Sequence, residues 1–526
     1  MHVKRLCLLR LVSSLCVLLI AGHDRTASAR DAAQSVWPTK EWLTSTPEAQ
    51  GMDSSALAKL VAYGAASSFD SLLVARHGRI VTEAYYAPYT GDIPHQIFSS
   101  TKAVTGTLLG MVYKDGLLDR LDHPMLDFFP DRRVAHVDDG KKAITIQNLL
   151  DMTSGLDWDQ GFEGGKQQSM LDLYRSANWT QFILDRPMAH APGEVFNYNN
   201  GNPDLVSAII TTLTGKLAED YAREKLFAPL GIVDWHWERD PQGLSIGEGM
   251  LYLLPRDMAK IGYLYLRHGE WEGRRLLPPG WADVLSHATV NMHASYDPNQ
   301  SYSNFFWVFP DKHVYMANGK NGQLIVVFPD LDVVAVTTAR KQVRYRALID
   351  AVSGAVTSES ALPPNPDAVG RLAKAIQDAA TEKPTAVGPT PEMAAAISGK
   401  TYKFPDNDLR LRSFTLDLTG PRPHIEFEEY YSSNSLTPSV MVEVPIGLDG
   451  LYRKGSPMLS GHNPGHIPAA KGTWLNGHTF VIDAQDVGYG EQQKFILTFS
   501  GSTLNIHRTV EVGEGWDVSV DGQQGD

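Results

Sequence analysis

A serine and a lysine three positions apart stand at the start of an apolar segment, in the stretch Phe98-Ser99-Ser100-Thr101-Lys102. If this segment is a helix, positions i and i+3 share one face, so the Lys102 amine can lie against the Ser99 hydroxyl. In the first turn of a helix, free N–H groups and the positive end of the dipole favour the oxyanion that forms when serine attacks a carbonyl. The spacing therefore predicts a nucleophile, a base and half of an oxyanion hole.

The spacing alone is weak evidence. In a chain of this length about one or two Ser-x-x-Lys matches are expected by chance, and this is the only one in the sequence. A third group must also relay the proton, and two Tyr-x-Asn triplets offer one. Tyr198 and Asn200 follow a Pro-Gly pair in a loop that leads into a predicted helix, whereas Tyr302 leads straight into a predicted strand. As isolated triplets they are uninformative, because a tyrosine in such a loop is usually a packing residue.

The elements around Ser99 predict an α/β domain with an all-helical insertion. The predicted elements are helices at 53–65, 99–116, 255–268, 279–288 and 345–356, a hairpin at 71–86, mainly helical patterns from 117 to 239, and strands between 305 and 339. Because strands and helices open and close the domain while helices fill its middle, we expect an antiparallel sheet flanked by helices, with the insertion beside it. The cleft between the two parts is the natural place for a site.

The rest of the chain is predicted to form a separate domain. After a segment rich in Pro, Ala and Thr, short runs alternate apolar and polar residues between glycine-bearing turns, which predicts an all-β barrel or sandwich, lipocalin-like in type. The predicted organisation is a leader at 1–29, an α/β part at 30–116 and 250–358, a helical part at 117–249, a linker at 359–397 and the all-β domain at 398–526.

The N-terminus is typical of a secretory signal peptide. Basic residues precede an apolar run at 11–21, and the small-residue site Ala27-Ser28-Ala29 follows. We therefore expect a periplasmic or secreted protein, and no later stretch is long enough to span a membrane. Both cysteines, Cys7 and Cys16, fall inside the leader, so a mature chain would have no disulfide, thiolate nucleophile or cysteine metal site.

Charge excludes one class of partner. The formal net charge is −13, and the chain has no basic runs, which argues against binding to nucleic acid. No feature of the sequence predicts an oligomeric state.

Several stretches occur together and in order between Trp42 and Thr338. They are residues 47–53, 98–102, 144–156, 192–200, 254–259 and 319–323. This combination resembles the serine hydrolases of the class C β-lactamase superfamily, and within it the esterase and 6-aminohexanoate-dimer hydrolase-like branch. The resemblance implies a β-lactamase/transpeptidase-like fold and no cofactor or metal.

The resemblance also implies roles for individual residues. Ser99 would attack a carbonyl to form an acyl-enzyme, with help from Lys102 in removing the serine proton, and Tyr198 would pass a proton to the leaving group. Either Lys102 or Tyr198 can be the general base. Asn200 matches a position that hydrogen-bonds the lysine or the substrate, and the backbone N–H groups of Ser99 and Lys320 would form the oxyanion hole. In this setting Tyr198 is favoured over Tyr302, and Asp157 and Trp158 are candidates for the cleft mouth.

The sequence departs from the family at the strand beside the site. β-Lactamases and DD-peptidases carry Lys-Thr-Gly there, and its lysine meets a substrate carboxylate. Aligned on Gly319, the triplet here is Ala317-Asn318-Gly319, which lacks the lysine; aligned on Gly322, it is Lys320-Asn321-Gly322. We prefer the Gly319 register because the other needs a larger deletion before Phe328. Asn318 and Gly319 then border the substrate, and recognition of a β-lactam carboxylate is weakened.

Three functions follow as hypotheses. The first is a serine hydrolase that cleaves a small ester or amide through an acyl-enzyme on Ser99. The second is a penicillin-binding DD-carboxypeptidase or weak β-lactamase, which uses the same chemistry. The third is a non-catalytic module that binds cell-wall or polymer fragments, and the presence of Ser99, Lys102 and Tyr198 together argues against it.

Overall fold

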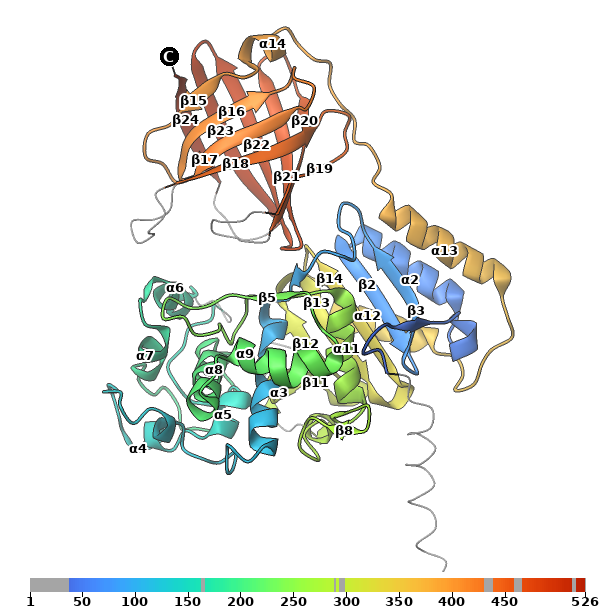
Figure 1. Ribbon diagram of the computed structural model, residues 1–526, viewed down its shortest axis with the longest axis vertical. Coiled ribbons are helices and arrows are strands. Elements are labelled where there is room, and N and C mark those ends of the chain that lie inside the picture. The colour runs from blue at the N-terminus through green and yellow to red at the C-terminus, as the bar shows by residue number, and fades with distance from the viewer. Residues whose placement is uncertain are drawn as a thin grey trace, which may run out of the picture.

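Two β-structures dominate the chain (Figure 1). One is an open nine-stranded sheet in the N-terminal part, and the other is a closed barrel in the C-terminal part. The computed structural model describes residues 37–161, 166–287, 290–292, 299–429, 439–457, 466–512 and 517–525. The leader predicted at residues 1–29 lies outside these ranges.

The open sheet is antiparallel except at one edge, where β1 pairs in parallel with β3. Its strands, in spatial order, are β1 (Leu43–Thr44), β3 (Arg79–Tyr85), β2 (Phe69–Arg76), β14 (Val333–Ala339), β13 (Gln323–Phe328), β12 (Val314–Gly319), β11 (Phe306–Phe309), β10 (Ser301–Ser303) and β9 (Val290–Asn291). Strands β2, β13 and β14 are buried at every position. Their near-continuous apolar sequences fit strands that are covered on both faces.

Helices provide that cover (Figure 1). Helix α11 packs on β13 and β14, while α2 packs on β2 and α13 on β3. The helices of this part are α2 (Ser54–Ala66), α11 (Pro255–Leu266), α12 (Tyr345–Ala355) and α13 (Pro366–Ala380). The helix predicted at 279–288 is wrong, because Gly280 adopts φ 81° and the chain forms only a 3-10 turn, Asp283–His287. Within the described residues, no helix combines the length and hydropathy needed to cross a bilayer.

The helical part lies beside the sheet, as the order of the elements predicts. Its helices are α4 (Asp139–Lys142), α5 (Ile146–Leu150), α6 (Gln168–Arg175), α7 (Trp179–Leu184), α8 (Gly201–Thr214), α9 (Ala218–Ala222) and α10 (Ala228–Leu230). Helix α3 (Thr101–Lys114) belongs to the residues predicted for the α/β part and borders this region. Helix α8 packs against α3, α5 and α7, and it ends at Gly215 with φ 67°. Small sheets complete this region: β4 (His95–Gln96), β6 (Leu251–Leu253) and β5 (Trp235–Trp237), and the pair β7 (Glu270–Trp271) and β8 (Arg274–Arg275).

The C-terminal part is a barrel rather than a sandwich. Nine strands follow one another around it, and a short parallel pairing of β18 with β20 closes the ring. In spatial order they are β18 (Val440–Gly447), β17 (His424–Glu429), β16 (Leu411–Asp417), β15 (Thr401–Lys403), β24 (Val518–Gln524), β23 (Thr503–Val512), β22 (Glu491–Ser500), β21 (Thr479–Val487) and β20 (Ile467–Trp474), with β19 (Arg453–Lys454) added beside β20. Inward apolar side chains fill the barrel, together with Ala394 and Ile397 of α14 (Met393–Ile397).

The segment predicted as a linker, 359–397, has structure of its own. Helix α13 occupies the middle of it, begins at the cap Asn365 and buries Leu372 in the core of the N-terminal part. The exposed connector at 381–391 then runs to the barrel, where Gly388 N–H donates to Thr473 Oγ1 at 2.8 Å.

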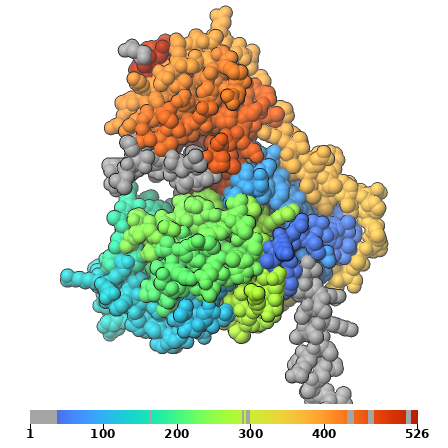
Figure 2. Space-filling model, in the orientation of Figure 1, coloured from blue at the N-terminus to red at the C-terminus, as the bar shows by residue number. Residues whose placement is uncertain are grey.

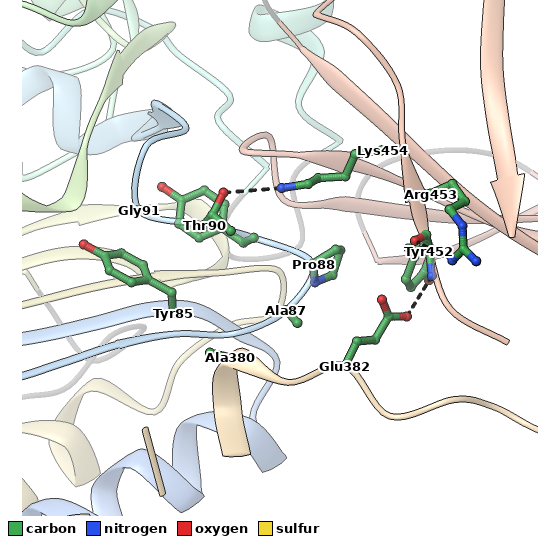
Figure 3. Close-up of a pocket in the computed structure, with 11 residues that line it drawn as sticks. Tyr85, Ala87, Pro88, Thr90, Gly91, Ala380, Glu382, Tyr452, Arg453 and Lys454 are labelled. Atoms are coloured by element: carbon green, nitrogen blue, oxygen red, sulfur yellow. Dashed lines mark hydrogen bonds between the residues drawn. The ribbon is translucent and has the colours of Figure 1, made fainter. Parts of the chain in front are cut away.

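The barrel lies against the α/β part (Figure 2). Apolar and polar contacts join the two. Tyr89 and Ile93, which follow β3, form a buried cluster with Ala469 and Val487 of the barrel. A hollow of about 400 Å³ lies at this junction. Hydrogen bonds from Lys454 Nζ to Thr90 Oγ1 (3.4 Å) and from Tyr452 N–H to Glu382 Oε1 (2.9 Å) bridge it, and Figure 3 draws the side chains that line it. The two parts therefore form a joint, packed structure.

Candidate active site

Ser99 lies in a short 3-10 turn, Phe98–Ser100, that runs directly into helix α3. The residue before it, Phe98, has φ 46°, a left-handed conformation that is unfavourable for a bulky side chain. Such strain persists only where the surroundings enforce it, and it is common at catalytic positions. Ser99 is partly exposed, while Ser100 beside it is buried and donates from Oγ to the Gln323 carbonyl at 2.6 Å. This contact fixes the turn with Ser99 facing a cleft.

Lys102 is directed at Ser99. Its Nζ lies 2.9 Å from Ser99 Oγ and 2.8 Å from the carbonyl oxygen of Glu248, and the side chain is 1% exposed. The 3-10 turn that carries Ser99 and the first turn of α3 that carries Lys102 together produce this contact, as the i, i+3 spacing predicts. A distance of 2.9 Å allows direct proton transfer between the two groups.

Tyr198 completes the group. Its ring lies over Lys102, with the Lys102 Nζ 5.1 Å from the ring centroid. Tyr302, the other sequence candidate, is fully buried and packs edge-on against Tyr198, with ring centroids 6.4 Å apart. Tyr198 borders the cleft together with Trp307, whose ring supports it at 6.2 Å. The structure therefore brings Ser99, Lys102 and Tyr198 together and places Tyr302 behind them.

Glu248 connects the polar groups around Lys102. Its Oε2 lies 3.6 Å from Lys102 Nζ and accepts a hydrogen bond from Asn200 Nδ2 at 2.8 Å, and its Oε1 accepts one from Tyr174 Oη at 2.9 Å. Asn200 is thus linked to the lysine through a carboxylate. We did not predict Glu248 from the sequence, where its signal is a charged residue between two glycines, Gly247 and Gly249.

A second carboxyl group lies beneath Glu248. Asp204, in the first turn of α8, accepts hydrogen bonds from the N–H groups of Gly247 (2.8 Å) and Glu248 (3.0 Å). Burial is the main cause that raises the pKa of Asp204 well above its ordinary value; the charge of Glu248 also raises it, while the two N–H donors and Lys102 lower it. The loop that carries Glu248 is held in place by this residue.

The end of strand β12 packs against the turn that carries Ser99. A Cβ atom on Gly319 would lie 2.2 Å from the carbonyl oxygen of Ile97, so the absence of a side chain lets the strand end approach the Ser99 turn. Lys320 begins the turn that follows, and both it and Asn318 border the cleft. In this geometry Ala317, which aligns with the lysine of Lys-Thr-Gly, lies on β12, while Lys320-Asn321-Gly322 forms the turn, which favours the Gly319 register.

Asp157 and Trp158 lie away from the reacting groups. Asp157 pairs with Arg186 at the surface at 3.1 Å, so the expectation that it borders the cleft mouth is not met. Trp158 is 5% exposed and donates from Nε1 to Gln160 Oε1 at 2.7 Å. Of the described residues of this loop, Gln160, Gly161 and Gln167 border the cleft, and Trp158 holds Gln160 by its hydrogen bond.

The cleft has a volume of about 690 Å³ and mixes apolar and polar walls. Most of its lining comes from the α/β and helical parts. Tyr489 and Glu491 are different, because they belong to the barrel. No local sequence pattern indicates that a residue so far along the chain reaches Ser99.

Comparisons with known proteins agree with this geometry. The family described as Beta-lactamase matches residues 55–353, more than half of the chain. The 6-aminohexanoate-dimer hydrolase of Paenarthrobacter ureafaciens is 25% identical over 286 residues, which cover 51% of this chain and 71% of that protein. The esterase/beta-lactamase LipL of Mycobacterium tuberculosis is 25% identical over 181 residues, 34% of this chain and 38% of LipL.

Among solved structures, EstCE1, a hydrolase with promiscuous acyltransferase activity, is similar with a TM-score of 0.47 and 17% identity, covering 58% of this chain and 99% of that chain. The family match spans the Ser99 turn, the Tyr198 loop and the end of β12, which all border the cleft. The chain therefore belongs to the Beta-lactamase family, and it is a serine hydrolase of that family.

Proposed function

We propose that this protein hydrolyses a small ester or amide through an acyl-enzyme on Ser99. The observation that carries the proposal is the 2.9 Å contact between Lys102 Nζ and Ser99 Oγ at the bottom of an open cleft. The 6-aminohexanoate-dimer hydrolase and the esterase/beta-lactamase among the relatives support this class of substrate.

The proposed reaction has two halves. Ser99 Oγ attacks the substrate carbonyl carbon as its proton passes to Lys102 or Tyr198, and the N–H groups of Ser99 and Lys320 stabilise the oxyanion. The C–O or C–N bond then breaks, and the leaving alcohol or amine takes the proton by way of Tyr198. Water attacks the acyl-serine ester in the second half, which releases the acid and restores Ser99. These steps use no group beyond the chain and water.

Hydrolysis of β-lactams is the second candidate within the same chemistry. Ala317, which stands on β12 in the place of the Lys-Thr-Gly lysine, carries no charge to meet a β-lactam carboxylate, which favours esters and amides. Lys320 borders the cleft at the next turn, so nitrocefin belongs in the substrate panel beside p-nitrophenyl esters of graded chain length and an aminohexanoate dimer.

A fluorophosphonate probe tests the nucleophile. The probe should label the wild-type protein, and Ser99→Ala should abolish labelling together with ester turnover. Ser502→Ala is a matched control, because Ser502 is an exposed serine in the turn between β22 and β23. Labelling that survives Ser99→Ala would refute the proposal.

A further inference from the structure

The turn between β21 and β22 of the barrel is fixed in the wall of the cleft. The carbonyl of Gly488 accepts a hydrogen bond from Gln96 N–H at 2.7 Å, and the carbonyl of Gly490 accepts one from Asn321 Nδ2 at 3.5 Å. Gly488 and Gly490 have φ 90° and 83°, so the turn depends on glycine at both positions. The turn therefore touches the two segments that carry Ser99 and Lys320.

Tyr489 extends from this turn to Phe98, the neighbour of the nucleophile. Its ring lies 5.6 Å from that of Phe98, the residue before Ser99, and 4.5 Å from the ring of His466. Both Tyr489 and Phe98 border the cleft. Together they form an aromatic surface beside Ser99, suited to the apolar part of a substrate.

Glu491, two residues further on, brings a carboxyl group to the same wall. Burial is the main cause that raises the pKa of Glu491, and Asp486 adds to it, whereas Lys320 and His466 act in the opposite direction. The carboxyl group of Glu491 thus lies near three other titratable side chains: Asp486, Lys320 and His466. A carboxylate in the wall accepts hydrogen bonds and attracts a positive charge.

A buried hydrogen-bond network holds the β21–β22 hairpin beside its turn. His466 Nε2 lies 2.8 Å from Tyr252 Oη, and His466 Nδ1 lies 2.5 Å from Asp486 Oδ2. Tyr252, on β6 of the hydrolase, also donates to Glu238 Oε1 at 3.0 Å. Since both domains contribute to this buried network, the positions of Tyr489 and Glu491 are set before substrate binds.

We propose that the hairpin turn 488–491 of the barrel selects the substrate. In this arrangement Tyr489 packs on the apolar chain of the acyl group, and Glu491 binds an amine or amide N–H that the acyl group carries. The inference rests on the proposed acyl transfer at Ser99 and deepens it by assigning a preferred class of acyl group. The barrel thereby becomes part of the enzyme's binding site.

A pair of isosteric substrates tests this role. p-Nitrophenyl 5-aminopentanoate and p-nitrophenyl hexanoate differ by an ammonium in place of a methyl group. The wild-type protein should favour the amino ester in kcat/KM, and Glu491→Gln should lower that ratio about tenfold, which corresponds to about 1.4 kcal/mol. Tyr489→Ala should raise KM for both esters while changing kcat little. Glu443→Gln, on an exposed carboxylate of β18, should leave the ratio unchanged.

Labelling of Ser99 separates the possible failures. Each variant is first checked for fluorophosphonate labelling at the wild-type rate, which shows that the reacting groups are intact. Normal labelling with an unchanged substrate ratio in Glu491→Gln and an unchanged KM in Tyr489→Ala would overturn the role of the hairpin alone. A wild-type protein that takes up no label would overturn the proposed function, and this inference with it.

Discussion

Residues that lie close in the sequence form only half of the candidate site. Ser99 and Lys102 meet because they lie three residues apart where a 3-10 turn runs into α3, whereas Tyr198, Glu248 and Lys320 come from loops and a strand end. The lysine has a protein partner on each side, with Ser99 Oγ at 2.9 Å and the Glu248 carbonyl at 2.8 Å. These two contacts hold the Lys102 amine within hydrogen-bonding distance of Ser99, where the two groups can exchange a proton.

A pair of tyrosines isolates the role of one hydroxyl group. Tyr198→Phe keeps the ring that packs between Lys102 and Trp307 and removes only the oxygen. If this oxygen carries the proton to the leaving group, kcat should fall by at least about 100-fold. Tyr302→Phe alters a neighbouring ring in the same way and should leave kcat within about threefold, because Tyr302 lies behind Tyr198. Equal effects of the two substitutions on ester turnover would contradict the assignment.

Asp204 should make stability depend on pH. Its pKa is raised in the folded protein, so the folded state binds its proton more tightly than the unfolded state does. Stability from this group is present below the unfolded pKa and is lost as the pH rises towards the folded pKa, by about 1.4 kcal/mol for each pH unit crossed. Urea unfolding between pH 4 and 8 should show this decline in the wild type, and Asp204→Asn should flatten it. Parallel curves for the two proteins would exclude Asp204 as the cause.

At the scale of elements, the approach of β12 to the Ser99 turn controls the geometry of the site. Both elements follow from local sequence: the apolar runs of β12, β13 and β14 predict strands, and α3 ends at the glycine that the sequence indicates. Their contact could not be predicted in this way. It depends on a glycine whose missing side chain is explained only by the position of Ile97 in the fold.

Gly319→Ala should test that contact. The added Cβ would lie 2.2 Å from the Ile97 carbonyl oxygen and 2.9 Å from Gln323 Cβ, so the strand end must move away from Ser99. A displacement of about 1 Å at a catalytic group costs on the order of 100-fold in rate, which is the fall in kcat/KM that we expect.

Gly354→Ala provides the matched control. Gly354 lies in α12, and nothing stands within 4 Å of an added Cβ. This change should leave kcat/KM unaltered and stabilise the helix by about 0.5–1 kcal/mol, since alanine favours helix more than glycine does. A Gly319→Ala protein as active as the Gly354→Ala protein would show that the strand end can move without loss.

At the scale of the whole molecule, the barrel and the hydrolase part share a buried interface. The alternation of short β runs predicts a separate β domain, and the structure contains one, closed by pairing of β18 with β20. The docking of that domain was not predictable, because it joins Tyr89 and Ile93 to Ala469 and Val487, residues that no local pattern relates. The same holds for α13, which lies in the predicted linker yet packs on α2.

Val487→Asn should loosen the interface. Val487 is 5% exposed within the cluster at the junction, and an amide there would be buried without its water, at a cost of about 2 kcal/mol. Limited proteolysis should then cleave the exposed connector at 381–391 faster than in the wild type. Val233→Asn, at a valine that is 87% exposed, makes the same chemical change where it should have no effect. Equal cleavage rates in the two variants would show that this cluster does not hold the barrel.

The position of the hairpin turn late in the chain has a consequence for synthesis. Chains are synthesised from the N-terminus, and the segments that carry Ser99, Lys102, Tyr198 and Lys320 precede residue 343 in the sequence. The barrel closes only when β24, which pairs with β15, has emerged. A nascent chain therefore acquires its reactive serine before it acquires Tyr489 and Glu491. Premature termination within the barrel would leave the cleft without the part of its wall that Tyr489 and Glu491 provide.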